Sequence, residues 1–191
     1  MRIKSNKILY IHGFKSSSNS MTLQKIKNRY GYIFDFIAPD LNGDVDKSIK
    51  IINEIIEVDK PRMIIGSSLG GFYALVCDSK DIPILVVNPC INPSEHLKQY
   101  IGNGITEEEV EKFGDYDVVS SIKSKGNKVS AILCPNDEIL GDTHLKLFEK
   151  IRGEEEKGKK VYICKSNFGH RAYPYGIVDI CDFIYETIIA I

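Results

Sequence analysis

A serine flanked by glycines is the residue of this chain best suited to covalent chemistry. Ser68 is the centre of the pattern Gly66-Ser67-Ser68-Leu69-Gly70, which lies between the apolar run Met63–Ser67 and the helix-compatible run Gly70–Asp78. A Gly-x-Ser-x-Gly pattern between a strand and a helix predicts a tight turn with the serine at its tip. The glycines fit this turn, because a Cβ two residues before or after the serine would collide with the neighbouring strand or helix. Ser68 is therefore the candidate nucleophile.

A serine hydroxyl is a weak nucleophile unless a base removes its proton, and His170 is the best-placed base. It follows the last expected strand, Val161–Lys165, at the carboxyl edge of the sheet, where ligands bind in open α/β sheets. His12 also ends a strand, but its place in His12-Gly13-Phe14 suits it better to shaping a loop beside the serine. We expect His96 and His144 to lie on the surfaces of helices.

The imidazole in turn needs a carboxylate to fix its tautomer and stabilise its cation. Asp137 directly follows the expected strand Val129–Cys134, so it reaches the same edge of the sheet as His170. Glu138 and Asp142 are neighbours that could replace it. Asp137 could also have a purely structural role in a turn or as a helix cap.

Two backbone N–H groups must point at the negative charge that develops on the substrate during an acyl transfer. Leu69 follows the nucleophile at the start of a helix and should supply one of them. Phe14, in the loop after the first strand, should supply the other, and Gly13 lets that backbone approach the substrate closely. We expect a substrate pocket formed by Gly13, Phe14, Tyr73, Phe168 and Tyr173, although these aromatic residues could equally belong to the core.

The elements that must position these residues alternate between strands and helices. Expected strands are Lys7–His12, Ile33–Ile37, Met63–Ser67, Ile84–Asn88, Val129–Cys134 and Val161–Lys165. Expected helices are Met21–Tyr30, Val45–Val58, Gly70–Asp78, Thr143–Arg152 and Ile177–Ile189. This alternation predicts an α/β fold with a mostly parallel central sheet and helices on both faces.

One segment, residues 92–124, breaks the alternation. Asn92-Pro93-Ser94-Glu95 and Thr106-Glu107-Glu108-Glu109 both have the pattern of a helix start with a capping box. We expect one or two short helices that form a small cap over the site, or that only pack against the body.

Composition limits the class of protein. The 191 residues are 43% hydrophobic and 27% charged, which is typical of a single soluble domain, here residues 1–191. A net charge of −1 without a basic stripe argues against a nucleic-acid partner, and no apolar stretch is long enough to span a membrane or to act as a signal peptide. The five scattered cysteines include no Cys-x-x-Cys pair, so we expect reduced thiols, no metal site and a cytoplasmic location.

The motifs together resemble a known family, the α/β-hydrolase-fold serine hydrolases, and specifically the small bacterial YqiA/YcfP-type esterases. The matching stretches are Leu9–Phe14 with Ser16–Ser18, Ile37–Leu41, Gly66–Ala74, Val87–Pro89, Asp137–Leu140 and Gly169-His170. The chain order Ser68, Asp137, His170 is also that of α/β hydrolases. The resemblance implies a compact hydrolase with little lid that acts on carboxylic esters or thioesters.

The hypothesis from the sequence is thus a two-step acyl transfer by a Ser68–His170–Asp137 triad, with no cofactor and a small-molecule substrate. The same triad could instead cleave amides, form peracids or break C–C bonds, because the fold does not fix the reaction. Two competing hypotheses are a catalytically silent binding protein and a thiol enzyme that uses Cys90 or Cys134.

Overall fold

The computed structural model describes residues 5–125, 127–154, 161–172 and 175–186. Its centre is a six-stranded, fully parallel sheet with the strand order β2-β1-β3-β4-β5-β6. The strands are β1 (Lys7–Ile11), β2 (Asp35–Ile37), β3 (Met63–Ser67), β4 (Ile84–Val87), β5 (Val129–Leu133) and β6 (Val161–Lys165). The predicted α/β fold with a parallel sheet is therefore confirmed, and β2 is two residues shorter than expected.

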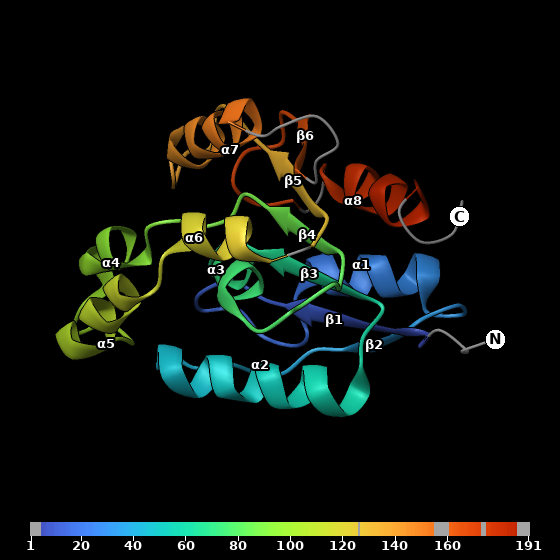
Figure 1. Ribbon diagram of the computed structural model, residues 1–191, viewed down its shortest axis with the longest axis horizontal. Coiled ribbons are helices and arrows are strands. Elements are labelled where there is room, and N and C mark those ends of the chain that lie inside the picture. The colour runs from blue at the N-terminus through green and yellow to red at the C-terminus, as the bar shows by residue number, and fades with distance from the viewer. Residues whose placement is uncertain (1–4, 126, 155–160, 173–174, 187–191) are drawn as a thin grey trace.

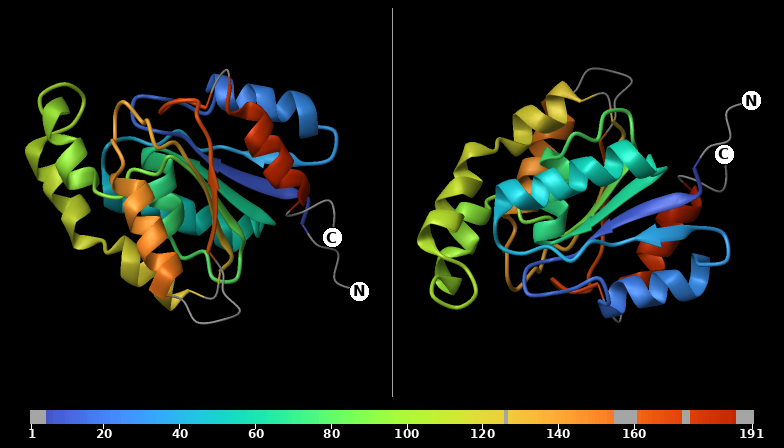
Figure 2. Two further views of the ribbon diagram at one scale, coloured as in Figure 1. Left: turned by 90° about the horizontal axis from the view of Figure 1, so that it is seen from above. Right: turned by 90° about the horizontal axis from the view of Figure 1, so that it is seen from below.

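Helices cover both faces of this sheet (Figure 1, Figure 2). They are α1 (Met21–Tyr30), α2 (Val45–Asp59), α3 (Leu69–Val76), α4 (Pro93–His96), α5 (Glu107–Lys112), α6 (Val118–Ser124), α7 (Thr143–Glu154) and α8 (Ile177–Ile184). Of these, α4 and α5 form a group beyond the carboxyl ends of the strands. The helix expected at 177–189 corresponds to α8, and the last three residues of that expectation, 187–189, lie outside the described residues. No described helix is both long enough and apolar enough to cross a bilayer.

The four inner strands, β1, β3, β4 and β5, are mostly apolar and buried because both faces of the sheet are covered there. In β1, Ile8 and Tyr10 pack into one core cluster with α1 and α8, whereas Leu9 and Ile11 pack into the other with α2, α3 and α7. Residues i and i+2 of a strand share a face, so this alternation is what a two-sided core requires. The result is a three-layer molecule whose carboxyl strand ends remain free to carry loops.

The chain reverses its direction of strand addition between β1 and β3. After β1 the chain adds β2 on one side, and it then adds β3 on the other side of β1. At such a switch point the two following loops diverge and leave a crevice, which is where open α/β sheets bind ligands. The loops at this point begin with His12 and Ser68.

Within residues 92–124, α4 and α5 lie beyond the carboxyl ends of the strands, toward which the arrows of Figure 1 point, whereas α6 runs back beside α3 over one face of the sheet. The Phe113 ring packs 5.4 Å from that of Phe72 in α3, and the Tyr100 ring lies 5.2 Å from that of Phe14. The segment therefore packs against the body and also reaches the loop that follows β1.

The two expected capping boxes in this segment had different outcomes. Thr106 and Glu109 form the box at the start of α5, with each side chain bound to the backbone N–H of the other. The box expected at Asn92 is wrong, because its side chain makes no cap hydrogen bond. Helix α4 is a single turn, so a box contributes little there.

Candidate active site

The backbone at Ser68 has the strained geometry that its motif predicts. The backbone of Ser68 has φ 55° and ψ −121°, a positive-φ conformation that residues other than glycine rarely adopt. A Cβ on Gly66 would lie 2.3 Å from the Gly70 carbonyl oxygen, and a Cβ on Gly70 would lie 2.0 Å from the Ile11 carbonyl oxygen. Only glycine fits at either position, so strand β3 can turn sharply into α3.

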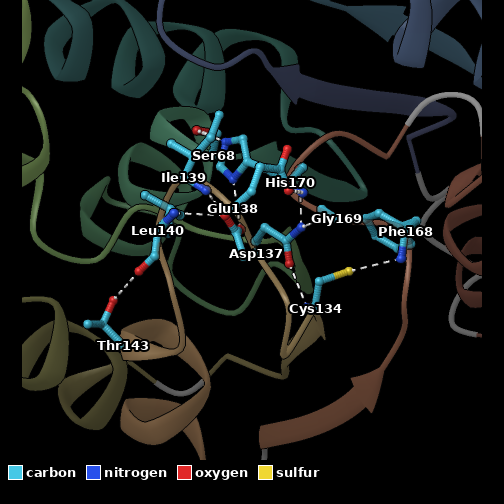
Figure 3. Close-up of polar contacts among 11 residues, drawn as sticks. Ser68, Cys134, Asp137, Glu138, Ile139, Leu140, Thr143, Phe168, Gly169 and His170 are labelled. Atoms are coloured by element: carbon cyan, nitrogen blue, oxygen red, sulfur yellow. Dashed lines mark hydrogen bonds and ion pairs between the residues drawn. The ribbon is translucent and has the colours of Figure 1, made fainter.

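The side chains of Ser68, His170 and Asp137 form a hydrogen-bonded chain at the carboxyl edge of the sheet (Figure 3). His170 Nε2 lies 2.9 Å from Ser68 Oγ, and His170 Nδ1 lies 2.8 Å from Asp137 Oδ2. Because a carboxylate only accepts, Nδ1 carries the proton and Nε2 is free to accept the proton of Ser68 Oγ. His170 and Asp137 are both buried, which shields this chain from water.

Among the carboxylates considered from the sequence, Asp137 is the one that contacts the imidazole. Glu138 accepts a hydrogen bond from the backbone N–H of His170 at 2.8 Å instead. Asp142 forms an ion pair with Lys146 at 2.8 Å. Neither of these two carboxylates binds the ring of His170.

Asp137 is held in its charged form. Burial by itself would raise the pKa of this carboxyl group, but hydrogen bonds from His170, Leu140 and Ile139 outweigh burial and keep the pKa below its usual value. A carboxylate that is charged at neutral pH can orient His170 and stabilise its cation.

The loop after β1 lies directly against the serine. A Cβ on Gly13 would come within 3.1 Å of Ser68 Cβ and 3.6 Å of Ser68 Oγ. His12 joins this loop to the segment after β2: Nδ1 lies 2.8 Å from the Gly13 carbonyl oxygen, and Nε2 accepts from the Leu41 N–H at 3.2 Å. The structure therefore gives His12 the loop-shaping place expected from the sequence.

This contact also sets the direction of an amide. The C=O of Gly13 and the N–H of Phe14 belong to one trans peptide and point in opposite directions. The Gly13 carbonyl faces His12 and accepts from Ser16 N, so the Phe14 N–H faces away from them. Leu69 is the first residue of α3, where N–H groups lack intrahelical partners and the helix dipole is positive. Across the described residues, neither amide has a hydrogen-bond acceptor.

A cavity of about 200 Å³ adjoins this loop. Its lining includes Gly13, Phe14, Leu69 and Tyr73, three of which were expected in a substrate pocket. Phe168 does not line it. The Phe168 ring is half-buried and packs on the opposite core cluster, against Gly176 at the start of α8, and its expected substrate-binding role stays a prediction. Tyr173 lies outside the described residues.

Two further expectations need correction. His144 is not on the surface: it is fully buried, and neither ring nitrogen has a hydrogen-bond partner among the residues described. The sequence does contain a signal for this, because His144, Phe148 and Ile151 follow helical spacing on the apolar face of α7. His96 is half-buried rather than exposed.

The structure also gives no support to a thiol nucleophile. Burial raises the pKa of Cys90 to about 12 and also raises that of Cys134. Reactive cysteines instead have lowered pKa values, because the thiolate is the nucleophile.

Asn88 belongs to the site and was assigned no role from the sequence. It is fully buried at the end of β4, and its side chain donates to the carbonyl oxygens of Gly169 and His170. The available signal was a polar residue that directly follows an apolar strand at the same sheet edge as Ser68.

A parallel sheet with a serine on a strained strand-to-helix turn defines the α/β-hydrolase fold. The model of the family described as uncharacterised protein family UPF0227 matches residues 7–144, more than half of the chain, and the chain belongs to this family. The resemblance to YqiA/YcfP-type proteins is thereby confirmed.

Solved structures with this fold cover almost the whole chain. Est1E from Butyrivibrio proteoclasticus is 13% identical, with a TM-score of 0.74 over 98% of this chain and 88% of its own. Alpha/beta hydrolase domain-containing protein 10 from mouse is 16% identical, with a TM-score of 0.73 over 96% and 89%. A monoacylglycerol lipase from Paleococcus ferrophilus is 18% identical, with a TM-score of 0.65 over 96% and 94%. At these identities the likeness establishes the fold.

Proposed function

We propose that the protein is a serine hydrolase that cleaves carboxylic esters or thioesters through an acyl-enzyme intermediate. The observation that carries this proposal is the hydrogen-bonded chain from Ser68 Oγ through His170 to Asp137 on a strained turn. Such a chain activates a hydroxyl group for attack on a carbonyl carbon. Structural neighbours that are named as hydrolases, a monoacylglycerol lipase among them, support the same class of reaction.

In the first step Ser68 Oγ attacks the carbonyl carbon while His170 Nε2 takes its proton. Asp137 stabilises the imidazolium that results, and the N–H groups of Leu69 and Phe14 bind the oxyanion. The imidazolium then protonates the departing alkoxide or thiolate as its bond to the carbonyl carbon breaks. In the second step His170 takes a proton from water, the water attacks the acyl-enzyme, and Ser68 leaves with its proton restored.

If the cavity that Phe14 and Leu69 line, but Ser68 and His170 do not, receives the acyl group, its size favours short acyl groups. Its volume of about 200 Å³ is below the roughly 300–1,000 Å³ of typical small-molecule pockets. Gly104, from the segment 92–124, contributes to its lining. We therefore assign that segment as a small cap on a single domain, with Tyr100 packed on Phe14. The five free cysteines support the proposed cytoplasmic location.

Labelling with a fluorophosphonate probe tests the nucleophile. We expect labelling of the wild type, none of Ser68→Ala, and unchanged labelling of Ser67→Ala, the adjacent serine of the same turn. Wild-type protein that is folded but unlabelled would overturn the proposal and favour the silent binding protein. p-Nitrophenyl esters of increasing acyl length then test the pocket, with kcat/KM expected to fall beyond short chains.

A further inference from the structure

The candidate base lies in a segment without regular secondary structure. His170 comes five residues after the end of β6, and residues 166–172 form neither helix nor strand. Such a segment lacks the hydrogen-bond ladder that holds a strand end in place. Yet the His170 ring must stay within hydrogen-bond distance of both Ser68 and Asp137 to transfer protons. Something other than secondary structure must fix its backbone.

Two side chains from different loops hold the backbone of His170 from opposite ends of the residue. Glu138 Oε2 accepts from the His170 N–H at 2.8 Å. Asn88 Nδ2 donates to the Gly169 carbonyl at 2.7 Å and to the His170 carbonyl at 3.1 Å. Figure 3 shows Glu138, Gly169 and His170 side by side between the ends of the strands.

Both ends of the Asn88 side-chain amide form hydrogen bonds in this role. Its Oδ1 accepts from the Cys134 N–H at 2.8 Å, while its Nδ2 serves the two carbonyls of the His170 segment. One side chain thus ties together the ends of β4 and β5 and the segment that carries the base. Aspartate would retain the acceptor and lose the donors, and leucine would lose both. The backbone φ of 42° at Asn88 is also one that asparagine tolerates better than most residues.

Glu138 links the backbone of His170 to the loop that also carries Asp137. Asp137 binds the ring of His170 and Glu138 binds its backbone, so two consecutive residues fix the same histidine. Gly169 makes room for this contact, because a Cβ there would lie 2.8 Å from Glu138 Oε2. Gly169 also has φ +79°, a conformation that favours glycine.

We propose that Asn88 and Glu138 are positioning residues that fix the imidazole of His170 between Ser68 and Asp137 by binding its main chain. The proposal rests on the proposed function for its kinetic consequences. Glu138 acts here as a hydrogen-bond acceptor, so its charge is dispensable.

The test compares Glu138→Ala with Glu138→Gln. Glutamine keeps an acceptor oxygen for the His170 N–H, loses the charge and replaces the other carboxylate oxygen with an NH2 group. We expect Glu138→Ala to lower kcat by about 10- to 100-fold with little change in KM, because a displacement of about 1 Å has an effect of this size. Glu138→Gln should stay within about threefold of the wild type. Glu57→Ala, the same substitution at an exposed glutamate of α2, is the matched control and should be unchanged.

Asn88→Asp removes the N–H donors that bind the Gly169 and His170 carbonyls, so it should also lower kcat. It keeps an oxygen that can accept from the Cys134 N–H. Circular dichroism checks folding, and Glu138→Ala carries the test if Asn88→Asp does not fold. A folded Glu138→Ala with unchanged kcat would overturn the proposal, as would a Glu138→Gln that is as impaired as Glu138→Ala.

Proton NMR separates this inference from the proposed function. The Nδ1 proton of His170, bound to Asp137, should give a downfield signal that Glu138→Ala shifts or broadens and Glu138→Gln retains. This signal is independent of turnover. Wild-type protein that is not labelled by the fluorophosphonate would count against the proposed function alone. An NMR signal that Glu138→Ala leaves unchanged would count against the positioning role.

Discussion

His170 Nε2 and Ser68 Oγ lie 2.9 Å apart, although 102 residues separate them in the chain. The parallel sheet brings them together, because β3 and β6 both end at the same edge. Asp137, after β5, reaches the other ring nitrogen from the strand between β4 and β6. One edge of the sheet therefore assembles all three side chains.

Asp137→Asn should lower kcat for p-nitrophenyl acetate by about 10³- to 10⁴-fold with the fold retained. An amide can donate to His170 Nδ1 and thereby place the proton on Nε2, where it blocks the acceptance of the Ser68 proton. Steady-state kinetics measures the loss, and circular dichroism checks the fold. Activity within tenfold of the wild type would show that another group orients the imidazole.

Asp137 should also stabilise the fold in a pH-dependent way. Its pKa is lowered in the folded protein, so the unfolded chain binds a proton more readily in acid. The stabilisation is complete above the unfolded pKa of about 3.9 and is lost as the pH falls through the lower folded pKa. Urea unfolding should show a stability difference between wild type and Asp137→Asn that is largest near neutrality and shrinks below about pH 4. A difference that does not change with pH would contradict this account.

Gly70→Ala should destabilise the protein by at least about 3 kcal/mol or abolish soluble expression. The new Cβ would lie 2.0 Å from the Ile11 carbonyl oxygen, and backbone cannot yield that far. Gly114→Ala is the matched control, since nothing lies within 4 Å of a Cβ there. It should change the free energy of unfolding by less than about 0.5 kcal/mol. Equal effects of the two substitutions would show that crowding at the turn is not the cause.

His144→Leu should stabilise the protein by about 1 kcal/mol near neutral pH, because it replaces a buried ring without hydrogen-bond partners in the described part of the chain. Burial lowers the pKa of His144, so below about pH 6.5 the unfolded chain binds a proton that the folded state excludes. Wild-type stability therefore falls as the pH drops through this range. The gain from His144→Leu, measured by urea unfolding, should be larger at pH 5 than at pH 8. A loss of stability would indicate that the ring has a partner.

Local patterns in the sequence were enough to predict the strands, the helices between them and the candidate nucleophile, but residues 92–124 contain three short α-helices where one or two were expected. The apolar runs identify strands that are buried on both faces, because only helices on both sides exclude water from such runs. The glycines around Ser68 predict the turn, because the steric conflict that they relieve lies within a few residues and is independent of the rest of the fold. His170 and Asp137 were predicted from their places after strands, since parallel strands end at a common edge.

Only the tertiary structure distinguished between neighbours on the same loop. Asp137 and Glu138 are adjacent and chemically alike, yet one binds the ring of His170 and the other its backbone. Which side chain points which way depends on how the loop after β5 packs against the segment after β6, and no local pattern encodes that packing. Asn88 was assigned no role for the same reason, because its three hydrogen bonds all cross to residues at least 46 positions away. Periodicity and steric exclusion act locally and can be predicted from the sequence, whereas contacts between loops follow from the assembled sheet.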